Sequence, residues 1–153
     1  MAHILIADDD ELIAEVASFA LIDAGHACGW VTSAEGALDL LEYKRPDILL
    51  LDQDMPGMTG LTLLRQLRSS PRFYDLPVIM FTAICGAQDE TQAVYAGAQD
   101  FVRKPFDPSR LIGCVDRMLA SRANRPRHTS LETYLAENSG RGRATPPQDR
   151  RII

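Results

Sequence analysis

The stretch PDILLLDQDMPGMTG occupies residues 46–60 of the chain. Its centre is an apolar run, residues 48–51, with a proline shortly before it and a Pro-Gly dipeptide after it. A short apolar run closed by turn residues is typical of a strand buried on both faces of a parallel sheet. Asp52 follows the run directly, and open α/β sheets bind ligands just outside the carboxyl ends of their strands. Although an aspartate there can be a simple turn former, Asp52 is the leading candidate for a chemical role.

The composition is that of an ordinary globular domain. The chain has 153 residues, of which 46% are hydrophobic and 24% charged, enough for one domain with its own core. No apolar run approaches the roughly 20 residues of a membrane span, and the N-terminus lacks the basic region of a signal peptide. We therefore expect a cytoplasmic protein.

The three cysteines, Cys28, Cys85 and Cys114, are far apart and form no CxxC pair. This spacing supports neither a disulfide framework nor a zinc site. We expect free thiols, with Cys28 in a strand, Cys85 in a loop and Cys114 on a helix face.

Charge divides the chain into two parts. Residues 1–121 hold 9 Lys/Arg and 18 Asp/Glu, a net charge of −9, whereas residues 122–153 hold 7 and 3, a net charge of +4. An acidic body argues against nucleic-acid binding by the body itself and suits magnesium or cationic partner surfaces.

Apolar runs alternate with helical patterns along residues 1–121. The other predicted strands are 4–7, 28–31, 77–82 and 100–103. Five β-then-α units in a row predict an α/β fold with a doubly wound, five-stranded parallel sheet. Right-handed crossovers leave few topologies, and we expect the flavodoxin-like strand order 2-1-3-4-5.

Helical spacing is clear after four of the five predicted strands. After the first strand, the apolar residues with this spacing are Leu12, Ile13, Val16, Phe19 and Ala20. In the last helix, begun by Asp107 and Pro108, the residues expected to face inward are Leu111, Ile112, Val115, Met118 and Leu119. The segment 87–96 has few apolar anchors, so we expect low local stability there.

Chemistry-bearing side chains follow four of the predicted strands. They are Asp8 and Asp9 after the first strand, Asp52 after the third, Thr82 at the end of the fourth and Lys104 after the fifth. In the predicted strand order these ends lie near one another. Acids, a hydroxyl and an ammonium group are therefore expected to converge on one site.

The pieces IADDD, LLLDQDMPGMTG, MFTA and FVRKPF, in this order and spacing, resemble a bacterial two-component response-regulator receiver domain, the CheY-like fold. The resemblance covers residues 3–121. It implies that Asp52 is the phosphoacceptor, phosphorylated by a phosphohistidine of a partner kinase. It also implies that Asp8 and Asp9 hold a Mg²⁺ ion.

Further roles follow from the same resemblance. The backbone carbonyl of Asp54 corresponds to a third protein contact to the metal, and Thr82 and Lys104 to the groups that contact the phosphoryl group. Phe101 takes the place of an aromatic switch residue. The bond before Pro105 is a candidate for the cis form.

Elementary electrostatics supports a magnesium and phosphate site. Crowded carboxylates resist ionisation unless a cation is near. Mg²⁺ prefers oxygen ligands, and positive charge around a transferred phosphoryl group is most of what its transfer requires.

Two residues depart from the family pattern. Asp54 adds a carboxylate two positions after Asp52, and Ile84, two after Thr82, is apolar and cannot position a water molecule. The Asp54 carboxylate has two alternative roles, contact with the metal or repulsion of the water that hydrolyses the phosphoryl group. Because Ile84 cannot position that water, we expect slow hydrolysis of the phosphoryl group, which a comparison of its lifetime with that of Ile84→Glu would test.

Residues 122–153 have the composition of a disordered tail. Thr129 and Glu132 have capping-box spacing, and Leu131, Tyr134 and Leu135 fit one face of a short helix near 130–137. We favour a disordered tail, with a docking segment as the alternative; 32 residues are too few for a DNA-binding output domain.

The predicted function is a stand-alone phosphorylation-dependent signalling switch in a phosphorelay, a regulator rather than an enzyme. Its partners would be a sensor histidine kinase or histidine phosphotransfer protein and a downstream protein, without nucleic acid or membrane. The expected partner surface, which also permits a homodimer, includes Asp89, Tyr95, Asp100, Phe101, Arg103, Arg110 and Arg117. The alternatives are a haloacid-dehalogenase-like phosphatase and a pseudo-receiver that binds partners without phosphorylation.

Overall fold

The computed structural model describes residues 1–82 and 97–123, which form one five-stranded parallel sheet with helices on both faces. The strand order is β2-β1-β3-β4-β5, so the predicted fold class and topology are confirmed. In chain order the elements are β1 (His3–Ala7), α1 (Glu11–Asp23), β2 (Ala27–Val31), α2 (Ala34–Tyr43), β3 (Ile48–Leu51), α3 (Gly60–Arg68), β4 (Val78–Thr82), β5 (Asp100–Arg103) and α5 (Pro108–Ala123).

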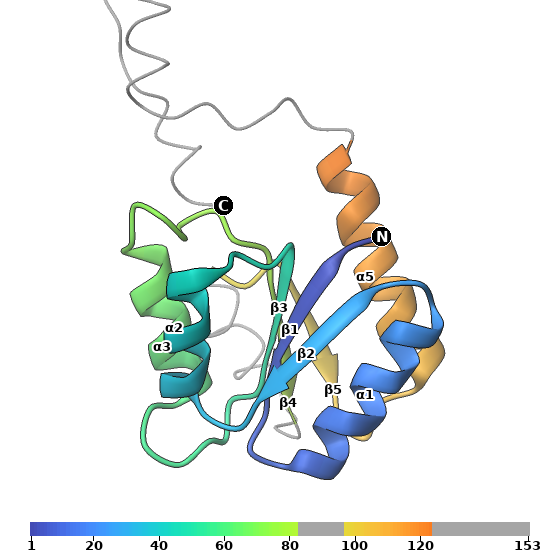
Figure 1. The fold of residues 1–153 in the computed structure, drawn as a ribbon, viewed down its shortest axis with the longest axis horizontal. Coiled ribbons are helices and arrows are strands. Elements are labelled where there is room, and N and C mark those ends of the chain that lie inside the picture. Colours follow the sequence, from blue (N-terminus) through green and yellow to red (C-terminus); the bar gives the residue numbers. More distant parts are fainter. Residues whose placement is uncertain (83–96, 124–153) are drawn as a thin grey trace, which may run out of the picture.

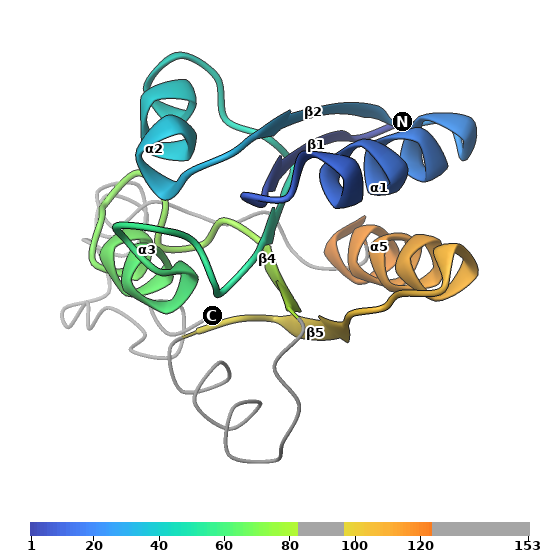
Figure 2. The same cartoon turned by 90° about the horizontal axis from the view of Figure 1, so that it is seen from below.

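The helices form a layer on each side of the sheet (Figures 1 and 2). Strands β1 and β3 alternate between the two layers because successive strand residues point to opposite faces. On β3, Leu49 and Leu51 join the core under α2 and α3, whereas Ile48 and Leu50 join the core under α1 and α5. All four β3 residues are fully buried, as expected for a central parallel strand.

The strand register brings the predicted site residues to one edge of the sheet. Ala7 at the end of β1 pairs with Leu51 at the end of β3, so the residues that follow them emerge side by side. At the other side of β3, Thr82 at the end of β4 pairs with Arg103 at the end of β5. Three loops and one strand end therefore meet at this edge.

Side-chain caps begin α2 and α5, and the cap at Asp107 is as predicted. The Ser33 hydroxyl accepts a hydrogen bond from the backbone N–H of Gly36 at 3.0 Å, at the start of α2. The Asp107 carboxylate accepts one from the N–H of Ser109 at 3.1 Å, at the start of α5. Leu111 and Val115 are buried on the inner face of α5, with the rest of its predicted inward set packed around them.

Helix α1 is present where predicted, but the large apolar residues of its helical spacing are not the buried ones. The core face of α1 consists of Ala14, Ala17, Ser18 and Leu21. In contrast, Leu12 is 69%, Val16 45% and Phe19 62% exposed, while Ile13 and Ala20 are partly buried. Small residues let a helix lie close to its sheet. The alanine face of α1 therefore packs on the core, and the larger side chains point outward.

Of the remaining predictions, those for Cys28 and Cys114 are confirmed, and the others concern residues that the structure does not describe. Cys28 lies in β2 and Cys114 is buried on α5, both as free thiols. Cys85, the weak helical segment 87–96 and residues 124–153 lie outside the described residues. Among the helices described, none has the length and apolarity needed to cross a bilayer.

Candidate functional site

The three consecutive aspartates after β1 have three different environments. Asp8 is fully buried; its N–H donates to the carbonyl of Val31 at 3.1 Å, and its Oδ1 accepts from the N–H of Asp10 at 2.9 Å. Asp10 is the N-cap of α1, since its carboxylate accepts from the N–H groups of Leu12 and Ile13. Asp9, between them, is exposed. One residue of the triplet thus caps a helix, and the other two remain available for a ligand.

Asp52 is fixed by the close approach of two backbone segments. Its N–H donates to the carbonyl of Ala7 at 2.9 Å, and only 3% of the residue is exposed. A Cβ added at Gly60 would lie 2.2 Å from the carbonyl oxygen of Asp52. Gln53 fixes the start of α3 through two hydrogen bonds. Its backbone carbonyl accepts from the N–H of Gly60 at 3.1 Å, and its side-chain oxygen accepts from the N–H of Leu61 at 2.7 Å.

Gln53 and Gly60 are positioning residues that the sequence reasoning did not find. Neither carries a reactive group, and a glycine after a turn has many ordinary explanations. Only the packing of α3 against the Asp52 backbone shows why a side chain at position 60 does not fit.

We expect Gly60→Ala to displace Asp52 and to destabilise the fold by about 1–3 kcal/mol, as overpacking does. The atoms that its Cβ would meet, in Asp52 and Gln53, are all backbone, so a side-chain rotation cannot relieve the clash. Urea unfolding would measure the change. Gly29→Ala is the matched control, because a Cβ at that position has no neighbour within 4 Å. Equal stability of the two variants would contradict this interpretation.

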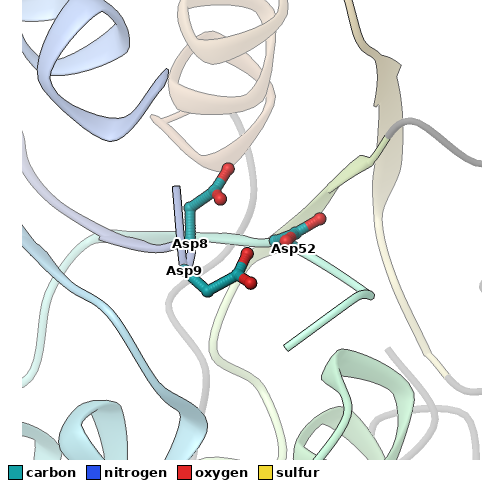
Figure 3. Close-up of side chains that lie close together, drawn as sticks. All are labelled: Asp8, Asp9 and Asp52. Carbon is teal, nitrogen blue, oxygen red and sulfur yellow. The ribbon is translucent and has the colours of Figure 1, made fainter. Parts of the chain in front are cut away.

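The carboxylates of Asp8, Asp9 and Asp52 form one cluster (Figure 3). One oxygen from each lies within 4.8 Å of the others, although the first two residues follow β1 and the third follows β3. Three oxygen donors at this spacing suit a divalent cation such as Mg²⁺ or Ca²⁺, which takes carboxylate oxygens. The exposure of Asp9 leaves that side of the cluster open to water and to a ligand.

Lys104 supplies positive charge to the cluster. Its Nζ forms an ion pair with Asp8 Oδ2, lies 3.4 Å from Asp52 Oδ1 and stands 5.0 Å from the centre of the Phe81 ring. The peptide bond between Lys104 and Pro105 is cis, as predicted. Four strand ends thus contribute to this edge, and three of them bring charged groups into contact.

Comparison with known proteins agrees with this arrangement. The sequence pattern of the response regulator receiver domain matches residues 4–116. The chain belongs to this family. The domain is accordingly a phosphorylation-dependent signalling switch, related to regulators that include PhoB, NtrC and CheY proteins.

Individual relatives show how much of each protein this receiver covers. The chain is 38% identical over 137 residues to the DNA-binding transcriptional regulator NtrC of Klebsiella pneumoniae, covering 88% of this chain and 29% of NtrC. It is 34% identical to the phosphate regulon transcriptional regulatory protein PhoB of Pseudomonas aeruginosa, covering 76% of this chain and 51% of PhoB. The chain therefore spans about half or less of the length of these relatives.

A solved structure supports the same fold. The chemotaxis protein CheY4 of Vibrio cholerae superposes with a TM-score of 0.72 at 28% sequence identity, covering 76% of this chain and 98% of CheY4. The receiver body thus matches nearly the whole of that crystallised chain.

The environment of the Asp52 carboxyl disfavours its charged form. Burial raises the pKa of Asp52 from 3.8 to about 6; the ammonium of Lys104 opposes the rise and the carboxylate of Asp8 adds to it. Desolvation therefore outweighs the attraction of one cation. Among the described residues, Lys104 contacts two of the three clustered carboxylates, so the cluster keeps an excess of negative charge that a further cation could offset.

The other predicted residues lie around this centre. Thr82 ends β4 beside Arg103, although the structure does not describe its side chain. Phe101, on β5, is partly buried against the core under α2 and α3. Asp54 is exposed, and its carboxylate is not part of the three-carboxylate group found among the described residues. Ile84 lies outside the described residues.

Proposed function

We propose that this receiver accepts a phosphoryl group on Asp52 from the phosphohistidine of a histidine kinase or phosphotransfer protein. The observation that carries the proposal is the position of the Asp52 carboxylate, buried, within 4.8 Å of oxygens of Asp8 and Asp9 and 3.4 Å from Lys104 Nζ. A nucleophile flanked by a cation site and by an ammonium group meets the electrostatic requirements of phosphoryl transfer.

The transfer step follows from the chemistry of these groups. An Asp52 oxygen attacks phosphorus, the P–N bond to the donor imidazole breaks, and the electron pair of that bond stays on the imidazole. Asp52 must be ionised to attack, so with a pKa of about 6 its reactive form predominates at neutral pH.

The chain's own residues would hold both the metal and the new phosphoryl group. We assign Mg²⁺ binding to the carboxylates of Asp8, Asp9 and Asp52 and to the backbone carbonyl of Asp54. When bound, Mg²⁺ neutralises charge that develops on the transferred oxygens. Lys104, already in contact with both buried carboxylates, would exchange its contact with Asp52 for a phosphoryl oxygen.

The response would pass to the α5–β5 side of the molecule. We assign the phosphoryl contact to the Thr82 hydroxyl and the switch to Phe101, which lies on the neighbouring strand. The described part of the proposed partner surface comprises Asp100, Phe101, Arg103, Arg110 and Arg117, whereas Asp89 and Tyr95 lie outside it. This surface would bind a downstream protein or a second receiver.

A cytoplasmic location fits the proposed phosphodonors. The described cysteines are free thiols, as is usual in a reducing compartment. We also propose that the receiver domain ends near residue 121 and that residues 122–153 form a tail outside it.

Mg²⁺-dependent labelling tests the proposal. We expect acetyl phosphate with Mg²⁺ to add one phosphoryl group per chain, and Asp9→Asn to need about tenfold more Mg²⁺ for the same extent, because an exposed ligand oxygen is lost. Intact-protein mass spectrometry would measure both. Asp39→Asn, an exposed aspartate on α2, is the control. Labelling of Asp9→Asn at wild-type Mg²⁺ concentrations would remove Asp9 from the metal site.

The same experiment distinguishes the alternatives. Absence of labelling in the presence of Mg²⁺ would favour a pseudo-receiver. Continuous turnover of a small phosphomonoester would favour a haloacid-dehalogenase-like phosphatase. Membership of the receiver family supports a signalling regulator instead.

A further inference from the structure

Helix α1 has two apolar faces, and only one of them packs on the sheet. Its outward face carries Leu12, Val16 and Phe19, spaced i, i+4 and i+7, with exposures of 69%, 45% and 62%. Ile22, at 48%, extends the same face toward the end of the helix. A helix that is apolar on all sides is normally a buried helix. These four residues, here called the outer α1 face, are covered by no residue that the structure describes.

The charges around the outer α1 face have one sign. Glu11, Glu15 and Asp23 are exposed on α1, and the helix contains no lysine or arginine. Two copies of this face would bring like charges together, which disfavours a symmetric α1–α1 dimer. The charge pattern instead suits an apolar segment with arginines on its flanks.

The C-terminal part of this chain carries such an apolar face between arginines, and Glu132 and Glu137 fall outside that face when the segment is helical. Leu131, Tyr134 and Leu135 have the spacing of one helical face, behind the capping-box pair Thr129 and Glu132. On either side of this segment stand arginines 125, 127, 141 and 143. The body of the receiver is acidic and residues 122–153 are basic, so the two parts attract each other.

Residues 124–130 are long enough to return from the end of α5 to α1. Both helices cover the same face of the sheet and lie next to each other (Figure 2), and His26, just after α1, contacts Asp116 of α5 at 3.3 Å. Helix α5 ends at Ala123, about two turns or ~10 Å beyond Asp116. From Ala123 back to the level of Phe19 the distance along the helix axes is about 20 Å, because Asp116 and His26 are in contact and lie about seven residues from these two points. Residues 124–130 can span about 23–25 Å when extended, which is enough to cover this distance together with the roughly 8–10 Å between packed neighbouring helices.

We propose that residues 130–137 dock on the outer α1 face of the same chain, with Leu131, Tyr134 and Leu135 against Leu12, Val16 and Phe19. A segment this short is marginal as an isolated helix, so its order would depend on the docking contact. The proposal concerns a binding surface and does not depend on phosphorylation of Asp52.

NMR of the full chain tests it. We expect NOEs from the methyl groups of Leu131 and Leu135 to those of Leu12 and Val16 or to the ring of Phe19. The double variant Leu131→Asp, Leu135→Asp should lose them and should exchange the amide protons of residues 131–135 about tenfold faster, because docking protects them. Phe19→Asp should have the same effect from the other side, and its exposed position leaves the core intact.

A matched variant makes the result specific. Ile152→Asp with Ile153→Asp introduces the same two charges outside the proposed segment, and we expect it to leave the NOEs in place. Loss of the NOEs in this control alone would overturn the proposal, as would their absence in the unmodified chain. In a mixture of labelled and unlabelled chains, NOEs that arise only between copies would also overturn it, since the occupant would then be a second molecule.

Discussion

Lys104→Met should lower the free energy of unfolding by about 3 kcal/mol in the presence of a chelator, the largest loss expected from any single change at the site. Lys104 is the cation in direct contact with Asp8 and Asp52, and both carboxylates are almost completely buried. Removing one partner of a buried ion pair leaves uncompensated charge, which costs about 3–5 kcal/mol. Urea unfolding followed by circular dichroism would measure the loss.

The other lysine of the chain provides the control. Lys44 is exposed at the end of α2, so Lys44→Met removes the same charge without uncovering a buried acid, and its effect should stay within about 0.5 kcal/mol. Mg²⁺ should restore part of the stability lost by Lys104→Met, because it supplies positive charge to the same carboxylates. Equal stability of the two lysine variants would contradict the assigned role of Lys104.

Asp52→Asn should have the opposite sign and should stabilise the metal-free protein at pH 7.5 by about 1–3 kcal/mol. The pKa of Asp52 is raised from 3.8 to about 6, chiefly by burial, and a rise of this size corresponds to about 3 kcal/mol. Because the folded state holds this proton more tightly than the unfolded state, stability falls as pH rises from about 4 to about 6. Asparagine resembles the protonated acid and removes that loss.

The pH dependence is the sharper part of this prediction. Below about pH 4 the carboxyl is protonated in both the folded and the unfolded state, so wild type and Asp52→Asn should be equally stable. The difference between their free energies of unfolding, here called the gap, should grow between about pH 4 and 6 and then stay constant. Urea unfolding at a series of pH values in chelator would show this, with Asp39→Asn as an exposed control. Added Mg²⁺ should close the gap, since it stabilises only the wild type. A gap of opposite sign at pH 7.5 would mean that Lys104 outweighs burial.

The sheet and the meeting point of the site could be predicted because they depend on simple patterns. Continuous apolar runs such as residues 48–51 fit a central parallel strand, and parallel strands bring their carboxyl ends to one edge. These patterns therefore predict that Asp8, Asp52 and Lys104 meet at that edge, and their ion contacts agree with this. The cap at Asp107 and the inward face of α5 followed from equally local signals.

The features that the sequence patterns did not predict depend on packing between distant segments. In α1 both faces are apolar, and periodicity alone does not say that Ala14 and Ala17, rather than Leu12 and Phe19, lie against the sheet. The clash that excludes a side chain at position 60 arises from the meeting of α3 with the backbone of Asp52. The convergence of Lys104 on the acids is predicted, but its pairing with Asp8 Oδ2 as well as its position near Asp52 Oδ1 depends on the reach of a long side chain.

Localisation of the phosphoryl group tests the central claim most directly. The full chain would be exposed to acetyl phosphate with Mg²⁺, digested, and analysed by tandem mass spectrometry, beside Asp52→Asn and the control Asp39→Asn. We predict one phosphoryl group on the peptide that contains Asp52 in the wild type and the control, and none in Asp52→Asn. Equal labelling of Asp52→Asn, or a phosphoryl group on any other residue, would contradict the assignment of Asp52 as the acceptor.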